Sequence, residues 1–176
     1  MNSLLLALGC GGGGLISDAA VTGEDYASLS GDQAWTWRQE LPAADTGDLD
    51  LDETLLLHGR YSEGSIELRR GTRWADAQSV GSIQFSQPNG GVQLESWELD
   101  GATGSGAMLA LEQPESGIAT PDCDTVVGLE VETFYGLFQR TLTADCGKSG
   151  VWSFEYGVGL IQVQAEELTL DLVAPY

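Results

Sequence analysis

The stretch 123–172 constrains the fold of this 176-residue chain more than any other part of the sequence. Apolar and polar residues alternate along it in short runs, which are separated by glycine-containing reversals such as Gly157-Val158-Gly159. Alternation with a period of two places successive side chains on opposite faces of a β-strand. Nowhere does the chain show three turns of helical periodicity. The stretch therefore predicts an antiparallel β domain.

The same pattern continues through most of the chain from Gly31 onward. Strands are predicted at 33–39, 54–61, 65–70, 79–86, 92–99, 108–111, 125–133, 137–145, 151–156, 160–164 and 168–173. The sequence P-N-G-G at 88–91 predicts a hairpin turn, whereas 101–106 and 113–122 are predicted loops. About ten short strands at intervals of roughly 8–12 residues favour an all-β domain. We expect an antiparallel, curved sheet that forms an open barrel or a sandwich.

The first ten residues read M-N-S-L-L-L-A-L-G-C, a short apolar run that ends in Gly9 and Cys10. This segment resembles the lipobox of bacterial envelope lipoproteins, in which signal cleavage leaves a lipid-modified cysteine as the first residue. The resemblance implies a lipoprotein-type signal at 1–10 and acyl chains on Cys10. It also implies a location in the bacterial cell envelope, facing the periplasm or the exterior. The alternative is an ordinary N-terminal segment with a free thiol.

Residues 11–30 are rich in glycine and then acidic, with few apolar residues. This composition predicts a flexible tether, so that residues 31–176 form a single domain. No segment approaches the ~18 consecutive apolar residues of a transmembrane helix. Attachment to a membrane would therefore depend on lipid at Cys10.

Three short motifs extend the resemblance into the domain: W-T-W at 35–37, G-L-F at 136–138 and Y-G-V-G-L-I at 156–161. They are similar to a pattern in uncharacterised all-β lipoproteins of the bacterial envelope. Those proteins have an opening aromatic strand, a G-x-F turn that enters a strand, and a glycine hairpin before the final strand. The resemblance implies a curved antiparallel sheet or an open barrel, and it is also compatible with a lipid-carrier-like half barrel. It implies no activity.

Three cysteines leave one of them unpaired in an oxidising compartment. If Cys10 carries the lipid, Cys123 and Cys146 remain as a disulfide pair. Closing the loop between them would stabilise the fold by roughly 3 kcal/mol in the chain-entropy model. The alternative is a pair of buried free thiols in a cytoplasmic protein.

Charge restricts the partners of the protein. The chain has 27 acidic and 7 basic residues, a formal net charge of −20. Such a surface repels phosphate backbones and anionic headgroups, which argues against nucleic-acid binding and against electrostatic membrane binding. Asp48, Asp50 and Asp52 are weak candidates for a metal site. Their alternation spreads them along one extended face, however, so a solvated acidic face is the preferred interpretation and no metal is predicted.

Catalytic motifs are missing from the sequence. His58 is the single histidine, and its apolar neighbours favour a structural role. A Ser-His-Asp or Cys-His device would have to use it, and no nucleophile-elbow motif is present. Gly147-Lys148-Ser149 resembles the end of a phosphate-binding loop but lacks the leading glycine. We therefore predict no cofactor and no enzymatic activity.

The aromatic residues remain the most suggestive feature. Trp35 and Trp37 share one face of a predicted strand, and Trp152, Phe154 and Tyr156 share one face of another. Such rows usually form a core between sheets. If they were exposed, they would stack against sugar rings or apolar ligands.

The sequence thus predicts a non-enzymatic, lipid-anchored envelope protein with a ligand- or partner-binding β domain. The ligand would be apolar or a glycan, and the membrane would be contacted through lipid on Cys10. The alternative is a carbohydrate-binding module or a carboxylate-dependent glycoside hydrolase, which would use exposed tryptophans and paired Asp or Glu side chains.

Overall fold

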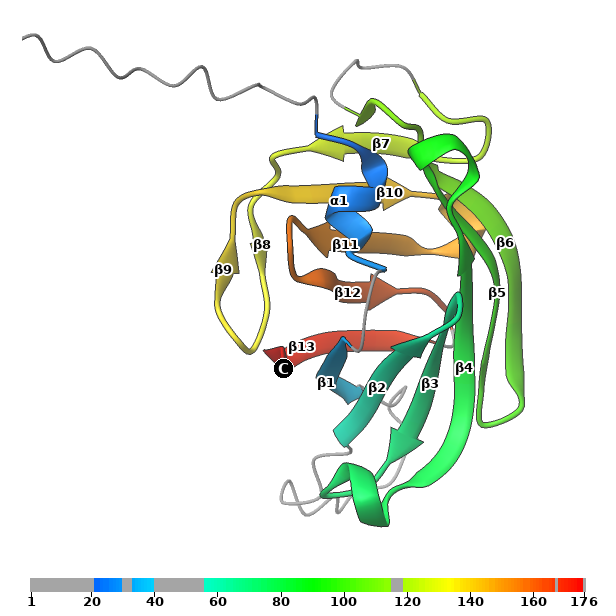
Figure 1. Cartoon of the computed structure of the whole chain (residues 1–176), viewed down its shortest axis with the longest axis vertical. Coiled ribbons are helices and arrows are strands. Elements are labelled where there is room, and N and C mark those ends of the chain that lie inside the picture. Colours follow the sequence, from blue (N-terminus) through cyan, green and yellow to red (C-terminus); the bar gives the residue numbers. More distant parts are fainter. Residues whose placement is uncertain (1–20, 30–32, 40–55, 115–118, 167, 176) are drawn as a thin grey trace, which may run out of the picture.

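A computed structural model describes residues 21–29, 33–39, 56–114, 119–166 and 168–175 (Figure 1). The predictions for Cys10 and for Asp48, Asp50 and Asp52 fall outside these residues. Among the helices in these ranges, none has the length and apolarity needed to cross a bilayer.

Eleven strands form one antiparallel sheet, which confirms the predicted all-β class and the curved sheet (Figure 1). Its first half is a meander of β1 (Ala34–Gln39), β2 (Leu56–Ser62), β3 (Ser65–Arg70), β4 (Gln78–Ser86), β5 (Val92–Leu99) and β6 (Ala102–Ala110). Its second half contains β7 (Asp124–Val127), β10 (Thr141–Asp145), β11 (Val151–Glu155), β12 (Gly159–Gln164) and β13 (Thr169–Pro175). The strand order is β6-β5-β4-β3-β2-β1-β13-β12-β11-β10-β7. Chain neighbours are therefore sheet neighbours almost throughout.

The sheet curls into a nearly closed barrel. The first and last strands, β1 and β13, join through a backbone ladder that has one bulge. The two edge strands, β6 and β7, meet through side chains instead. The hydroxyl of Thr125 donates to the carbonyl of Leu109 (2.8 Å), and the carboxylate of Asp122 accepts the backbone N–H of Met108 (2.9 Å). These bonds occupy edge groups that would otherwise be free to pair with another chain.

Two tryptophans on β1 occupy the barrel interior beside β12. Trp35 and Trp37 are 1% and 0% exposed, and their rings stack at 5.6 Å. The indole N–H of Trp35 donates to the carbonyl of Val158 (2.7 Å), and that of Trp37 donates to the carbonyl of Leu160 (3.2 Å). A buried indole N–H without a partner would destabilise the fold, so these bonds allow tryptophan in the core.

A second aromatic group crosses the interior from the opposite side of the barrel. Phe85 on β4 makes edge-to-face contacts with Trp152 (6.2 Å) and Phe154 (6.1 Å) on β11. The indole N–H of Trp152 donates to the carbonyl of Ser149 (2.8 Å) in the short 3₁₀ turn η4 (Gly147–Ser149). The interior is therefore packed with rings from strands that are distant in the sheet order.

A short helix corrects the predicted tether. Helix α1 (Gly23–Ala27) contacts β5 and β10–β12, and Tyr26, Ala27 and Leu29 are buried. Thr22 and Asp25 form a capping box at its start. Residues 21–29 therefore belong to the domain. The segment has few apolar residues, and a five-residue helix is too short to show helical periodicity, so its sequence alone predicts a tether.

The predicted loop at 101–106 is also corrected, because β6 begins at Ala102. Gly104 lies against the indole of Trp97, and Gly106 lies against the carbonyl of Leu94. A Cβ at either position would collide with the neighbouring strand, so glycine is what allows β6 to pair closely with β5. Glycines that usually mark a loop here serve close strand packing.

Two predicted strands, 125–133 and 137–145, are each divided in the structure. The chain leaves the sheet after β7, forms a separate hairpin of β8 (Val131–Glu132) and β9 (Leu137–Phe138), and returns as β10. Gly128 has a φ of +79°, a conformation that favours glycine, and it marks the point of departure. We call residues 129–139 the outer hairpin. Figure 1 shows it projecting beside the barrel.

The predicted disulfide between Cys123 and Cys146 is confirmed. Cys123 precedes β7 and Cys146 follows β10, and these two strands pair with each other. The bond therefore fixes the β7 edge close to the residues that bridge to β6.

Candidate functional site

The five aromatic residues that the sequence suggests as ligand-facing do not form an exposed surface. Four of them are core residues with at most 1% exposure: Trp35, Trp37, Trp152 and Phe154. The fifth, Tyr156, is half-buried. Its ring packs edge-on against Tyr26 (6.0 Å), and the guanidinium of Arg140 lies 3.9 Å from its centroid. The ligand-facing hypothesis is therefore corrected for the four buried rings, because closure of the barrel turns their shared faces inward.

The single histidine has a structural role. His58 is 8% exposed, and its Nε2 lies 2.9 Å from the carbonyl of Gly71 while its Nδ1 lies 2.9 Å from the hydroxyl of Thr36. A carbonyl can only accept, so Nε2 carries the hydrogen and Nδ1 accepts from the threonine hydroxyl. Both ring nitrogens thus have a partner within the protein. The ring fixes the start of the loop 71–77.

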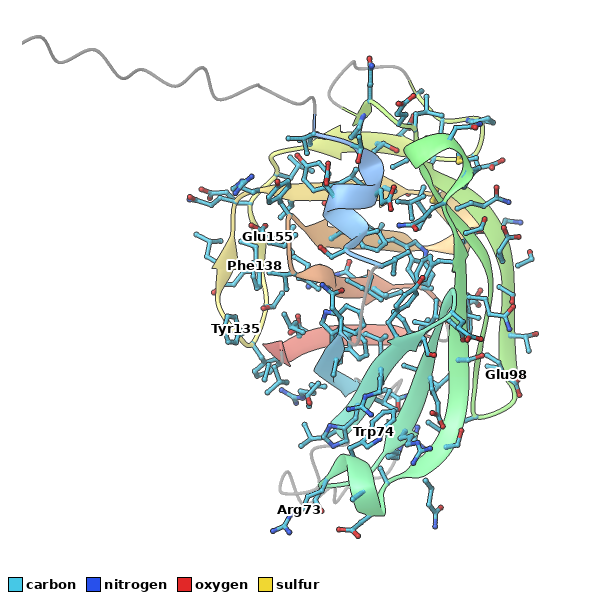
Figure 2. All side chains as sticks on the ribbon, in the orientation of Figure 1. Arg73, Trp74, Glu98, Tyr135, Phe138 and Glu155 are labelled. Carbon is cyan, nitrogen blue, oxygen red and sulfur yellow. A yellow bond between two sulfur atoms is a disulfide. The ribbon has the colours of Figure 1, made fainter. Side chains whose placement is uncertain are left out.

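The loop 71–77 follows β3 and carries the short 3₁₀ turn η1 (Trp74–Asp76). Two arginines from neighbouring strands lie close to the ring of Trp74. The guanidinium of Arg69 on β3 is 4.6 Å from the ring centroid, and that of Arg60 on β2 is 5.4 Å away. Figure 2 shows Trp74 beside these strands, with Arg73 at the lower end of the molecule. These two cation–π contacts orient the ring.

A groove of about 440 Å³ lies beside this ring; we call it the Trp74 groove. It is lined by Ala34, Trp35, His58, Gly59, Arg60, Thr72, Arg73 and Trp74. Its two charged lining residues, Arg60 and Arg73, are both cationic. The groove thus combines an aromatic ring with two guanidinium groups, which suits a ligand that has both an apolar part and an anionic group.

The two arginines of the groove have no ion-pair partner among the described residues. Arg69 pairs with Glu67 (2.9 Å) and Arg70 pairs with Asp100, whereas no described carboxylate lies within 4.0 Å of Arg60 or Arg73. Glu67 stands opposite Arg60 in the β2–β3 register, but its carboxylate contacts Arg69.

Among the described residues around the groove, positive charge exceeds negative charge. Three arginines, Arg60, Arg69 and Arg73, face two carboxylates, Glu67 on β3 and Asp76 on η1. The whole chain has a formal net charge of −20. The groove is therefore a cationic position on an acidic protein, and an anion repelled elsewhere would be attracted to it.

A second hollow contains carboxylates and so bears on the glycoside-hydrolase alternative. It lies over β3–β5 and is lined in part by Glu67, Glu98 and Asp100. Glu67 and Asp100 are each ion-paired to an arginine. Such a hydrolase needs a carboxylic acid with a raised pKa beside a carboxylate.

Burial raises the pKa of Glu155, against the opposing effects of the Arg140 backbone N–H and guanidinium. Glu155 lies on β11, and Figure 2 shows it and Glu98 on opposite sides of the molecule. The raised pKa and the acidic hollow are therefore in different places. In the ranges covered by the structure, no group of three His, Cys, Asp or Glu side chains is arranged to hold a metal ion.

Sequence reasoning did not single out Arg60, Arg73 or Trp74. One signal was present, because four of the seven basic residues fall between positions 60 and 73. What the sequence did not show is that a turn carries Trp74 back over β2 and β3. No family model, curated protein or solved structure matches this chain.

Proposed function

We propose that this protein is a non-enzymatic binding protein of the bacterial cell envelope, anchored by lipid on Cys10, whose β barrel binds a small organic anion in the Trp74 groove. The observation that carries the proposal is the pair Arg60 and Arg73. Two guanidinium groups without described ion-pair partners line one groove, next to an aromatic ring, on a protein with a formal net charge of −20.

The chemistry of the groove defines the ligand class. A guanidinium group offers paired N–H donors that match the oxygens of a carboxylate or a phosphate. Trp74 supplies a face or edge for an apolar or planar part of the ligand. A groove of about 440 Å³ suits a small molecule better than a polymer. The ligand is therefore a small carboxylate or phosphate ester with an apolar body.

The site is preorganised, which supports a binding role. Glu67 holds Arg69, and Arg69 together with Arg60 orients the ring of Trp74. His58 fixes Gly71 at the start of the same loop. Groups that are already positioned lose less conformational entropy when a ligand binds.

Anchoring rests on the resemblance of residues 1–10 to a lipobox. Its test is the intact mass of protein extracted from membranes of a bacterium that expresses the full gene. We expect acyl chains on Cys10 and a two-hydrogen deficit from the disulfide. A full-length mass with an unmodified Cys10 would contradict the anchor without affecting the groove.

The binding proposal is tested by calorimetric titration with benzoate and phenyl phosphate, using benzyl alcohol and a methyl glycoside as neutral controls. We expect one or both anions to bind, more weakly at high salt, and the neutral compounds not to bind. Comparing the two anions distinguishes carboxylate from phosphate recognition. Arg60→Ala and Arg73→Ala should each weaken binding by about tenfold or more, the usual effect of losing a hydrogen bond to a charged group.

Lys148→Ala is the matched control, because it removes the same charge from an exposed residue that does not line the groove. It should leave anion affinity nearly unchanged. Equal binding of the anions and the neutral compounds, or unchanged affinity in both arginine variants, would contradict the proposal. Binding of the glycoside alone would favour a carbohydrate-binding module.

A further inference from the structure

The exposed apolar residues of the protein are concentrated in one segment. Five large apolar side chains in the described ranges are at least 46% exposed, and all of them fall between positions 126 and 137. They are Val126, Leu129, Phe134, Tyr135 and Leu137. Three of these residues, Phe134, Tyr135 and Leu137, form the end of the outer hairpin. Exposed apolar residues gathered in one place usually mark an interaction surface.

The hairpin holds these side chains in fixed positions. Its inner face is formed by Val131 and Phe138, which are cross-strand partners and pack against the core. The turn is closed by reciprocal backbone bonds between Thr133 and Gly136 (2.9 and 3.1 Å). The backbone N–H of Tyr135 donates to the carbonyl of Leu172 on β13 (2.9 Å), which ties the tip to the barrel.

Charge at the tip differs from charge on the rest of the protein. Residues 133–138 include no carboxylate, and the first one on the hairpin is Glu132, the cross-strand partner of Leu137. A cation also lies at the tip: the guanidinium of Arg38 on β1 is 4.5 Å from the centroid of the Phe134 ring. Phe and Tyr side chains next to an arginine are typical of protein segments at a membrane–water interface.

The size and shape of the patch favour a bilayer over a folded protein partner. Phe134, Tyr135 and Leu137 each expose slightly more than half of their surface, so the tip presents roughly 300 Å². A standard protein interface needs about 800 Å² from each partner. A small convex tip suits insertion between lipid headgroups, for which no complementary protein surface is required.

The proposed anchor supplies the proximity that such a small patch needs. Eleven positions separate Cys10 from Val21, the first described residue. An extended chain of that length spans at most about 40 Å. Lipid on Cys10 would therefore hold the barrel within about that distance of the bilayer, where the effective concentration of the hairpin is high.

We propose that Phe134, Tyr135 and Leu137 insert into the interfacial layer of the bilayer that holds the lipid anchor. The hairpin is then a second attachment point, which restricts the orientation of the barrel relative to the membrane. This inference rests on the proposed function for the presence of the anchor, but not for the Trp74 groove.

The test imposes the anchor chemically, so that it does not depend on lipidation in the cell. The full chain is coupled through the Cys10 thiol to phosphatidylcholine vesicles that contain a maleimide lipid. Amide hydrogen exchange is then compared with that of uncoupled protein. We expect exchange within 129–139 to slow by tenfold or more in the coupled protein. Unchanged exchange in this segment would overturn the inference.

Two variants make the result specific. Phe134→Ser combined with Leu137→Ser should abolish the vesicle-dependent protection and leave anion binding in the Trp74 groove unchanged. Trp74→Ala should weaken anion binding and leave the vesicle-dependent protection unchanged, since it removes an aromatic side chain elsewhere on the surface. Protection that increases with protein concentration when vesicles are absent would assign the patch to a second copy of the chain, and would also overturn the inference.

Discussion

The aromatic rings inside the barrel and those outside it have different neighbours. Inside, Trp35 stacks on Trp37, and their N–H groups bond to backbone carbonyls. Outside, three rings each have an arginine beside them: Trp74 has Arg60 and Arg69, Phe134 has Arg38, and Tyr156 has Arg140. An inner ring is stabilised mainly by burial, whereas an outer ring keeps an accessible face or edge next to a cation.

The difference shows what an alternating row of aromatics can reveal. Alternation correctly places Trp35 with Trp37, and Trp152 with Phe154, on one face of a strand, whereas Tyr156 lies beyond the end of β11. It does not show whether that face meets the core or a ligand. Trp74, which lies in a turn outside any alternating row, lines the groove together with Trp35, beside two arginines that have no ion-pair partner among the described residues. Trp35 is almost fully buried, so the more accessible of these two rings is the one that the pattern does not include.

The largest expected effect is a difference in stability between two alanine variants, one that removes an inner ring and one that removes an outer ring. Trp37→Ala should lower the free energy of unfolding by about 3–5 kcal/mol, because it leaves a cavity in a packed interior. Trp74→Ala should change it by less than about 1 kcal/mol. Urea denaturation followed by circular dichroism measures both. If Trp37→Ala does not fold, Trp37→Phe tests the same contact. Equal losses in the two alanine variants would contradict the distinction.

Removing the disulfide should lower the free energy of unfolding somewhat less than Trp37→Ala does. The double variant Cys123→Ser with Cys146→Ser is expected to lose about 3 kcal/mol of stability. Cys146 directly precedes the turn whose Ser149 carbonyl accepts the indole N–H of Trp152. The near-ultraviolet circular dichroism of tryptophan should therefore weaken, while anion binding at Trp74 should persist below the melting temperature. A variant as stable as the wild type would show that the bond does not support the core.

The smallest expected effect concerns Glu155, the neighbour of Tyr156. The ring of Tyr156 is half-buried and therefore intermediate between the inner and the outer rings. Its neighbour Glu155 has a pKa raised above 4.5 by burial, so the folded state holds the proton more tightly than the unfolded state. Stability contributed by this group is present below the unfolded pKa and is lost as pH rises through the folded pKa.

Glu155→Gln should consequently be slightly more stable than the wild type at pH 7, and the difference should vanish as pH falls below about 4. The glutamine oxygen can still accept the backbone N–H of Arg140, which the carboxylate accepts at 3.1 Å. Melting temperatures measured from pH 3 to pH 8 provide the comparison. A variant that is less stable than the wild type at pH 7 would mean that the Arg140 contacts outweigh burial.

Much of the fold could be predicted because its strands follow local rules. The predicted bounds 65–70 and 92–99 are those of β3 and β5, and the hairpin at 88–91 is present. The prediction failed at β6, where Gly104 and Gly106 mark close packing against a neighbouring strand. It also failed at 21–29, where three buried apolar residues lie among polar ones. In both cases the decisive contact exists only once elements pack together: β6 against the adjacent strand β5, and helix α1 against β5 and β10–β12.

The Trp74 groove could not be predicted for the same reason. Arg60 and Trp74 come from separate elements, and their approach depends on how the loop 71–77 folds back over β2. That no described carboxylate pairs with Arg60 or Arg73 is likewise a result of tertiary placement. Glu67 is directly opposite Arg60 but contacts Arg69 instead.

Alternation and turn residues were enough to predict an antiparallel all-β domain, because these signals act between near neighbours in the chain. The cysteine count predicted the disulfide only on the condition that Cys10 carries lipid, and the structure decided that Cys123 and Cys146 lie together. Tertiary structure decided which faces are inside. Pairing of β1 with β13, together with the side-chain bridges between β6 and β7, closes the barrel and turns the aromatic rows inward. The same closure leaves Trp74 and the tip of the outer hairpin on the surface, because burial depends on the curvature of the whole sheet and not on any single strand.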